Sequence, residues 1–69
     1  MSASKNQALA NAQKLAQRGL FDKAIKAYRS VAEQDPDDIR IWLKIGDLYS
    51  RKGAVSDAVE TYTKVANVY

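Results

Sequence analysis

The sequence predicts an all-α fold of tandem antiparallel helix-turn-helix hairpins, and three features support that prediction. Strong turn-forming residues divide the chain at only three places, Gly19, Pro36 and Gly53. The segments between these breaks are about fourteen residues long, which suits helices and exceeds most strands. Each segment carries apolar residues at intervals of three and four, the spacing of one helix face. With 69 residues, the chain has room for a single small domain.

The first helix is expected over residues 4–17, after an N-terminal tail of residues 1–4. Ser4 is a good N-cap residue, and Gln7 three positions later would complete a capping box. The apolar stripe of this helix is interrupted by Asn11 and consists mainly of small residues: Ala8, Leu9, Ala12, Leu15 and Ala16. This segment therefore has the weakest apolar face of the four.

The second and fourth helices are expected over residues 21–34 and 55–69. The stripe of the second comprises Phe21, Ala24, Ile25, Tyr28, Val31 and Ala32. The stripe of the fourth comprises Val55, Ala58, Val59, Tyr62, Val65, Ala66 and Tyr69. Both stripes follow the helical spacing and neither follows the alternation of a strand.

The third helix is expected over residues 38–51, because Pro36 prevents the second helix from continuing and Asp37 or Asp38 can cap a new one. Its stripe comprises Trp42, Ile45, Gly46 and Tyr49, widened by Ile41 and Leu48. Gly19 and Gly53 follow the first and third helices, and both suit the left-handed conformation that ends many helices.

The chain repeats itself with an offset of 34 residues, the length of one helical hairpin. Six of the 35 compared pairs are identical: Leu9/Leu43, Gly19/Gly53, Ala24/Ala58, Tyr28/Tyr62, Val31/Val65 and Ala32/Ala66. Random matching would give roughly two identities. A period of this length in a helix-turn-helix unit indicates stacked helical repeats.

A glycine in mid-helix, Gly46, predicts a close helix contact. Glycine costs about 1 kcal/mol relative to alanine in a helix, so its presence is tolerable where another helix approaches closely. Ala12 occupies the matching place in the first unit. We expect four large aromatic side chains to supply much of the buried area: Tyr28, Trp42, Tyr49 and Tyr62.

These residues resemble the tetratricopeptide repeat family. The second unit, residues 39–69, carries the pattern residues Trp42, Ile45, Gly46, Tyr49, Gly53, Ala58 and Tyr62. The first unit, residues 5–38, departs from it in its first helix, with Ala8 for the Trp and Asn11 for the Leu. The resemblance implies a fragment of an α-solenoid with a right-handed arc. It also implies a scaffold for protein partners, bound on a concave face that the first helices line.

Composition excludes most catalytic and metal sites. The chain has no cysteine and no histidine, so thiolate sites, zinc clusters and histidine-based catalysis are excluded. The cluster of Asp35, Asp37 and Asp38 fits helix capping and lacks the twelve-residue ligand spacing of a calcium loop. The three isolated glycines form no phosphate loop. We therefore expect no enzyme activity, no cofactor and no metal. The absence of a targeting segment or membrane span makes the cytoplasm the default location.

The resemblance also implies a binding face on the first helix of each unit. The residues expected to point into it are Asn6, Leu9, Gln13 and Gln17, then Arg40, Leu43, Lys44, Asp47 and Arg51. Asp47 and Arg51 can pair at i, i+4, which would leave Arg40 and Lys44 uncompensated. A peptide carrying a carboxylate or an acidic stretch would suit this face. The alternative is a solvated helix surface.

Two other functions remain open at this point. The segment after Val59 is still helical in pattern and apolar at the chain end, which predicts self-association through Val59, Val65, Val68 and Tyr69, or a fragment of a longer array. A homo-oligomer formed by exchange of a hairpin is one form of this hypothesis. Helical repeats of about 35 residues also bind single-stranded RNA, but the net charge of +3 is small and no aromatic residue lies on the predicted face.

Overall fold

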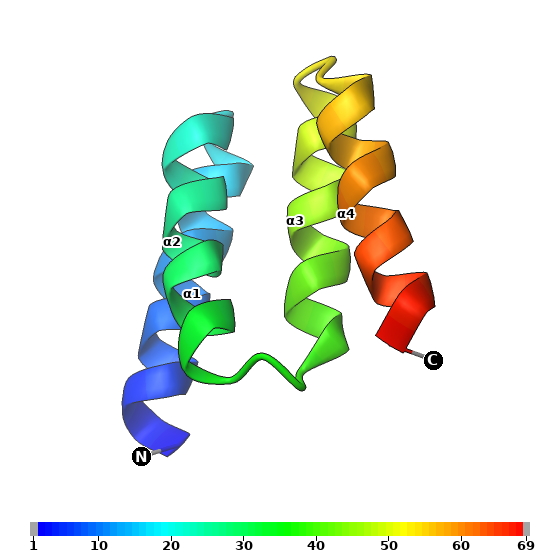
Figure 1. The fold of residues 1–69 in the computed structure, drawn as a ribbon. Coiled ribbons are helices and arrows are strands. Elements are labelled where there is room, and N and C mark those ends of the chain that lie inside the picture. The colour runs from blue at the N-terminus through cyan, green and yellow to red at the C-terminus, as the bar shows by residue number, and fades with distance from the viewer. Residues whose placement is uncertain (1, 69) are drawn as a thin grey trace.

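A computed structural model describes the backbone of residues 2–68 and the side chains of residues 4–67. It contains four helices: α1 (Ser2–Gln17), α2 (Phe21–Gln34), α3 (Ile39–Arg51) and α4 (Val55–Val68). They form two antiparallel hairpins joined by a short loop around Pro36 (Figure 1). No strand occurs in residues 2–68. The predicted all-α fold and the order of its helices are confirmed.

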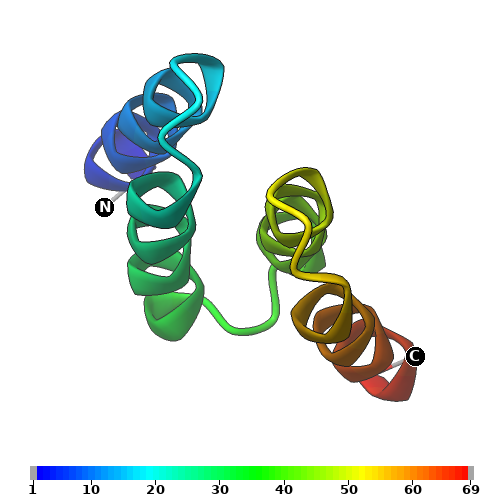
Figure 2. The same ribbon diagram turned by 90° about the horizontal axis from the view of Figure 1, so that it is seen from above.

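The four helices follow one another as a zigzag layer. Helix α2 packs on both α1 and α3, and α3 packs on both α2 and α4. Figure 2, seen from above, shows α1 and α4 at the two ends of this layer. The layer measures 32 × 29 × 12 Å, so each helix reaches the surface on at least one side.

The helix ends follow the predicted local signals. Gly19 and Gly53 adopt φ angles of 78° and 85°, the left-handed conformation expected of them. After α1, the Leu20 amide donates to the Leu15 carbonyl at 3.0 Å and the Gly19 amide to the Ala16 carbonyl at 3.0 Å. This pair of hydrogen bonds is a Schellman motif, and the same pair recurs after α3.

The start of α3 confirms one predicted cap, and the start of α1 contradicts another. Asp38 caps α3, and its Oδ1 accepts a hydrogen bond from the Arg40 amide at 3.2 Å. Helix α1 begins at Ser2, so the predicted tail is largely helical and Ser4 lies inside the helix. The capping box of Ser4 and Gln7 was therefore wrong. Residues 2–4 contain neither Gly nor Pro, so nothing local prevents the helix from extending.

One hydrophobic core joins the first three helices. Its buried members are Ala12 from α1, Ala24, Ile25, Tyr28, Val31 and Ala32 from α2, and Ile41, Ile45 and Leu48 from α3. Helix α4 packs on α3 through buried Ala58 and Thr61. The predicted close approach at Gly46 is also present, since a Cβ there would lie 2.7 Å from Cε1 of Tyr62.

The aromatic side chains differ in burial from the prediction. Tyr28 is buried, and Trp42 and Tyr49 are half-buried. Tyr62 was expected to be buried, but it is exposed. One side of its ring rests on Gly46, whereas no helix among residues 2–68 covers the outer side of α4.

Two polar contacts join α2 to the second hairpin at the surface. The Arg29 guanidinium of α2 donates to the Tyr49 hydroxyl of α3 at 3.3 Å. Lys52, at the end of α3, forms an ion pair with Asp22 in the first turn of α2. Both pairs are exposed, so we expect them to orient the hairpins more than they stabilise them.

Candidate functional site

A hollow of about 180 Å³ opens between α1 and α3, with α2 between them. Its lining comprises Gln13, Ala16 and Gln17 from α1, Tyr28 from α2, and Lys44, Asp47, Leu48 and Arg51 from α3. We call this surface the α1–α3 groove. Both hairpins contribute to it, so its shape depends on how α3 packs against α2.

The groove combines an apolar floor with polar walls. Tyr28 and Leu48 belong to the core and are buried, whereas Gln13 and Gln17 are exposed one helical turn apart. Burial raises the pKa of the Tyr28 hydroxyl above its ordinary value. The hydroxyl therefore stays protonated at neutral pH, when it can take part in hydrogen bonding without carrying charge.

One positive charge in the groove lacks a partner. Arg51 Nε and Asp47 Oδ2 form the predicted i, i+4 ion pair at 3.4 Å. In the part of the chain that the structure describes, no carboxylate lies within ion-pairing distance of Lys44. The groove therefore carries one uncompensated ammonium group, at its α3 wall.

The structure brings together only part of the predicted binding face. Gln13, Lys44, Asp47 and Arg51 line the groove, as does Gln17. The remaining members of the predicted set do not line it: Asn6, Leu9, Arg40 and Leu43.

Three of these residues have identifiable surroundings. Leu9 is half-buried and packs against the core, as its place in the apolar stripe predicts, so its assignment to the exposed binding face was wrong. Leu43 remains exposed on α3, next to Lys44 in sequence. Asn6 is exposed near the start of α1, away from the groove residues of that helix.

The prediction that Arg40 carries an uncompensated charge was wrong. The Nε atom of Arg40 lies 3.1 Å from Asp38 Oδ1, and its Nη2 atom donates a hydrogen bond to Asp38 Oδ2 at 3.2 Å. Asp38 is the N-cap of α3, and its carboxylate holds both the backbone and the side chain of Arg40. Of the two cations singled out, only Lys44 remains available to a ligand.

The groove also includes three residues that the sequence analysis had not placed in a binding face: Ala16, Tyr28 and Leu48. All three had been assigned to packing stripes, and they do pack. The edge of a packing stripe can also form the floor of a groove. The polar tip of Tyr28 was the available signal for this second role.

Comparison with known proteins identifies the chain's family. A family model described as TPR repeat matches residues 12–53. A second model, described as Tetratricopeptide repeat, matches residues 39–69. The chain belongs to the tetratricopeptide repeat family. Repeats of this family are in general protein–protein interaction modules and typically noncatalytic scaffolds. No match was found among curated proteins or solved structures.

An ion cluster fixes the start of the first tetratricopeptide repeat to its end. Lys5 Nζ of α1 lies 2.6 Å from Asp35 Oδ2 and 2.9 Å from Asp38 Oδ2. Two hydrogen bonds hold the pKa of the Asp38 carboxyl well below its usual range, and the one from Arg40 has a larger effect than the one from Lys5. The cluster therefore joins three elements: α1, the loop around Pro36 and the cap of α3.

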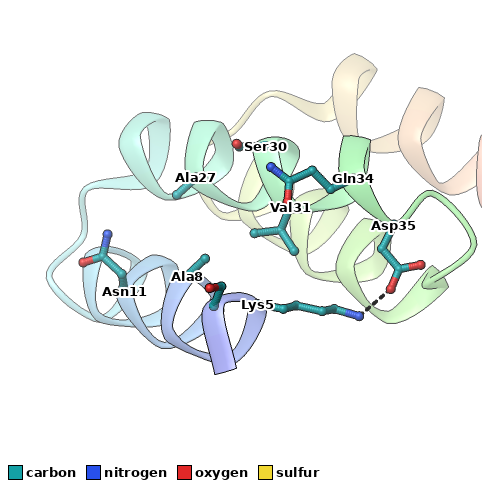
Figure 3. A pocket seen from close by; sticks show the side chains of 9 residues that line it. Lys5, Ala8, Asn11, Ala27, Ser30, Val31, Gln34 and Asp35 are labelled. Carbon is teal, nitrogen blue, oxygen red and sulfur yellow. Dashed lines mark hydrogen bonds and ion pairs between the residues drawn. The ribbon is translucent and has the colours of Figure 1, made fainter. Parts of the chain in front are cut away.

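A second hollow, of about 600 Å³, lies between the N-terminal half of α1 and the C-terminal half of α2 (Figure 3). The pair of Lys5 and Asp35 closes one end of it, and the rest is lined mainly by small side chains such as Ala8 and Ala27. In the second repeat, Trp42 stands at the position of Ala8, and the hollow that Trp42 helps to line is about 140 Å³. The absence of an indole at Ala8 therefore accounts for part of the difference in volume.

The residues predicted for self-association have different environments. Val59 is exposed on α4, and Val65 is half-buried. The side chain of Val68 and the whole of Tyr69 lie outside the described residues. Val55 and Tyr62 are also exposed apolar residues of α4, and the prediction had omitted them.

Neither a metal site nor a membrane span was found in the part of the chain that the structure describes. No group of three or more Asp or Glu side chains there could hold a metal ion. None of the described helices is long and apolar enough to cross a membrane.

Proposed function

We propose that the α1–α3 groove binds a peptide segment of a partner protein and that Lys44 holds a carboxylate of that peptide. The observation that carries this proposal is the uncompensated ammonium group of Lys44 beside a groove shared by both repeats. An ammonium group without an internal partner is free to form a charge-assisted hydrogen bond with a ligand.

The neighbouring side chains suit the backbone of such a peptide. Gln13 and Gln17 each offer a donor and an acceptor along the opposite wall, α1. Leu48 and Tyr28 offer apolar contact at the floor, and exposed Leu43 extends that contact beside Lys44. Peptide-binding grooves use this combination of an apolar floor and a few placed polar groups.

A titration of the isotope-labelled chain with peptides carrying acidic or uncharged side chains tests the proposal. Acidic peptides should shift the backbone amides of Gln13, Gln17, Lys44 and Asp47, and uncharged peptides of the same length should bind more weakly. Shifts confined to α4 would contradict the placement.

A matched pair of variants isolates the charge of Lys44. Lys44→Gln should weaken binding of an acidic peptide about 1.4-fold to fivefold, because exposed ion pairs contribute about 0.2–1 kcal/mol. Lys23→Gln removes the same charge from an exposed position of α2 that does not line the groove, and it should leave binding unchanged. Equal weakening by both variants would show that net charge, and not the groove, controls binding.

A further inference from the structure

The outer surface of α4 carries a line of exposed apolar residues that no other helix in the described part of the chain covers. Val55, Val59 and Tyr62 follow the spacing i, i+4 and i+7, so they lie on one face of the helix. Their exposed fractions are 65%, 58% and 41%. We call these three residues the α4 stripe.

The internal repeat shows what normally covers such a stripe. The residues 34 positions earlier are Phe21, Ile25 and Tyr28 of α2. Ile25 and Tyr28 are each only 5% exposed, because α3 packs on α2 within the same core cluster. The same face is therefore covered by the next helix in the first repeat, whereas no helix among residues 2–68 packs on the outer side of α4 in the second (Figure 2).

We propose that the α4 stripe pairs with the α4 stripe of a second copy of the chain across a twofold axis. The pairing brings two α4 helices together in antiparallel orientation and covers each stripe with the other. A twofold interface uses the same patch on both copies, so it closes as a dimer.

The outer face of α1 argues against the other way of joining copies, in which α1 of one copy packs on α4 of the next. In α3, the residues that meet α2 in the core are Ile41, Ile45 and Leu48. The matching residues of α1 are polar: Gln7, Asn11 and Lys14. Burying these groups without partners is costly, so a head-to-tail array of copies is disfavoured.

The distribution of charge on α4 favours pairing of the stripe with itself. Asp57, Glu60 and Lys64 are the charged residues between Val55 and Asn67, and all three line the hollow beside Trp42. Lys64 Nζ lies 5.6 Å from the centre of the Trp42 ring, on the α3 side of the helix. Two copies can therefore bring their stripes together without placing like charges opposite each other.

Sedimentation equilibrium of the 69-residue chain tests the proposal over a concentration series reaching about 1 mM. The average mass should rise from 7.7 kDa towards twice that value and should not exceed it. Val59→Lys places a charge at the middle of the stripe and should raise the dimer dissociation constant at least about tenfold. Ala10→Lys introduces the same charge at an exposed residue of α1 that belongs to neither the stripe nor the groove, and it should leave the dimer dissociation constant unchanged.

Cysteine cross-linking tests the twofold geometry, because the chain contains no cysteine of its own. A single cysteine replacing Val59 lies near the centre of the stripe and should form a disulfide-linked dimer on mild oxidation. A cysteine replacing Lys64, on the α3 side of the same helix, should form it much more slowly.

Several outcomes would overturn the proposal. A folded wild-type chain that stays at 7.7 kDa across the series would do so, as would a mass that grows beyond two copies. A monomer whose α4 binds a peptide with the sequence of α3 would show that a helix of another chain is the occupant. Peptide binding by the groove does not depend on any of these results, since the groove and the stripe share no residue.

Discussion

Replacing Ala8 by tryptophan should stabilise the protein, because the first repeat has room for the side chain that the second repeat already carries. Ala8 lines the hollow of about 600 Å³ between α1 and α2. At the equivalent position of the second repeat, Trp42 is half-buried between α3 and α4 and leaves a hollow of about 140 Å³. The Ala8→Trp side chain should adopt the same position between α1 and α2.

The expected gain follows from the burial of the equivalent residue. A tryptophan buries about 150–250 Å² when it is well covered, so a half-buried one buries about 100 Å². At about 25 cal/mol per Å², this contributes about 2.5 kcal/mol. Lower helix propensity removes about 0.5 kcal/mol, and ordering of the side chain removes about 1 kcal/mol. The net gain in the free energy of unfolding is about 1 kcal/mol.

Urea and thermal denaturation of the wild type and two variants measure this gain. A stabilisation of about 1 kcal/mol should raise the melting temperature of a domain of this size by about 4–8 °C. Ala10→Trp places the same side chain at an exposed position of α1 and should lower the free energy of unfolding by about 0.5 kcal/mol. If Ala8→Trp destabilises the chain as Ala10→Trp does, the hollow is not an indole-sized vacancy in the packing.

Three further predictions concern backbone and charge. Gly46→Ala should lower the free energy of unfolding by about 0–2 kcal/mol, because an overpacking cost of about 1–3 kcal/mol against Tyr62 offsets a helix-propensity gain of about 1 kcal/mol. In a Tyr62→Leu background the same change should raise the free energy of unfolding by about 1 kcal/mol. Identical effects in both backgrounds would refute the contact. Gly53→Ala should lower the free energy of unfolding by about 1 kcal/mol, because a φ of 85° at this position strains any residue with a Cβ. An unchanged midpoint in urea titrations would contradict this. The pKa of Asp38 is lower in the folded than in the unfolded state, mainly because of its hydrogen bond from Arg40. The ionised carboxylate therefore stabilises the fold above the unfolded pKa, and this contribution is lost as the pH falls below about 5. Urea midpoints measured between about pH 5 and pH 2 should therefore decline less steeply for Asp38→Asn than for the wild type, and equal slopes would exclude this carboxylate as the cause.

Local signals in the sequence were sufficient for the helices and their order, but not for what surrounds each helix. Turn glycines, Pro36 and the capping Asp38 act within a few residues, so they predicted the breaks correctly. The apolar spacing placed Tyr62 on a buried face, but whether that face is covered depends on a neighbouring helix, which spacing does not encode. The charge of Arg40 was judged along its own helix, although its partner is the cap that precedes the helix.

The candidate site shows the same limit. Exposed positions of α1 and α3 were predicted from the repeat pattern, and Lys44 lies where that pattern expected it. The floor of the groove was missed because Tyr28 and Leu48 were assigned a single role, in the core. Only the packing of two repeats against each other shows that one side chain can fill the core and also form the floor of a groove.

The positions of the groove and the α4 stripe have a consequence for how the protein binds its partners. The groove lies between α1 and α3, whereas the stripe lies on α4. Helix α4 is at one end of the layer (Figure 2). A dimer formed through the stripe therefore leaves both grooves open and carries two peptide sites. A partner with two acidic segments on a linker that spans both sites would bind such a dimer more tightly than a single segment does, because its second contact is intramolecular. In the Val59→Lys variant the tighter binding of the two-segment partner should disappear, while the affinity for a single peptide stays the same. That result would show that the stripe affects partner binding only through dimerisation.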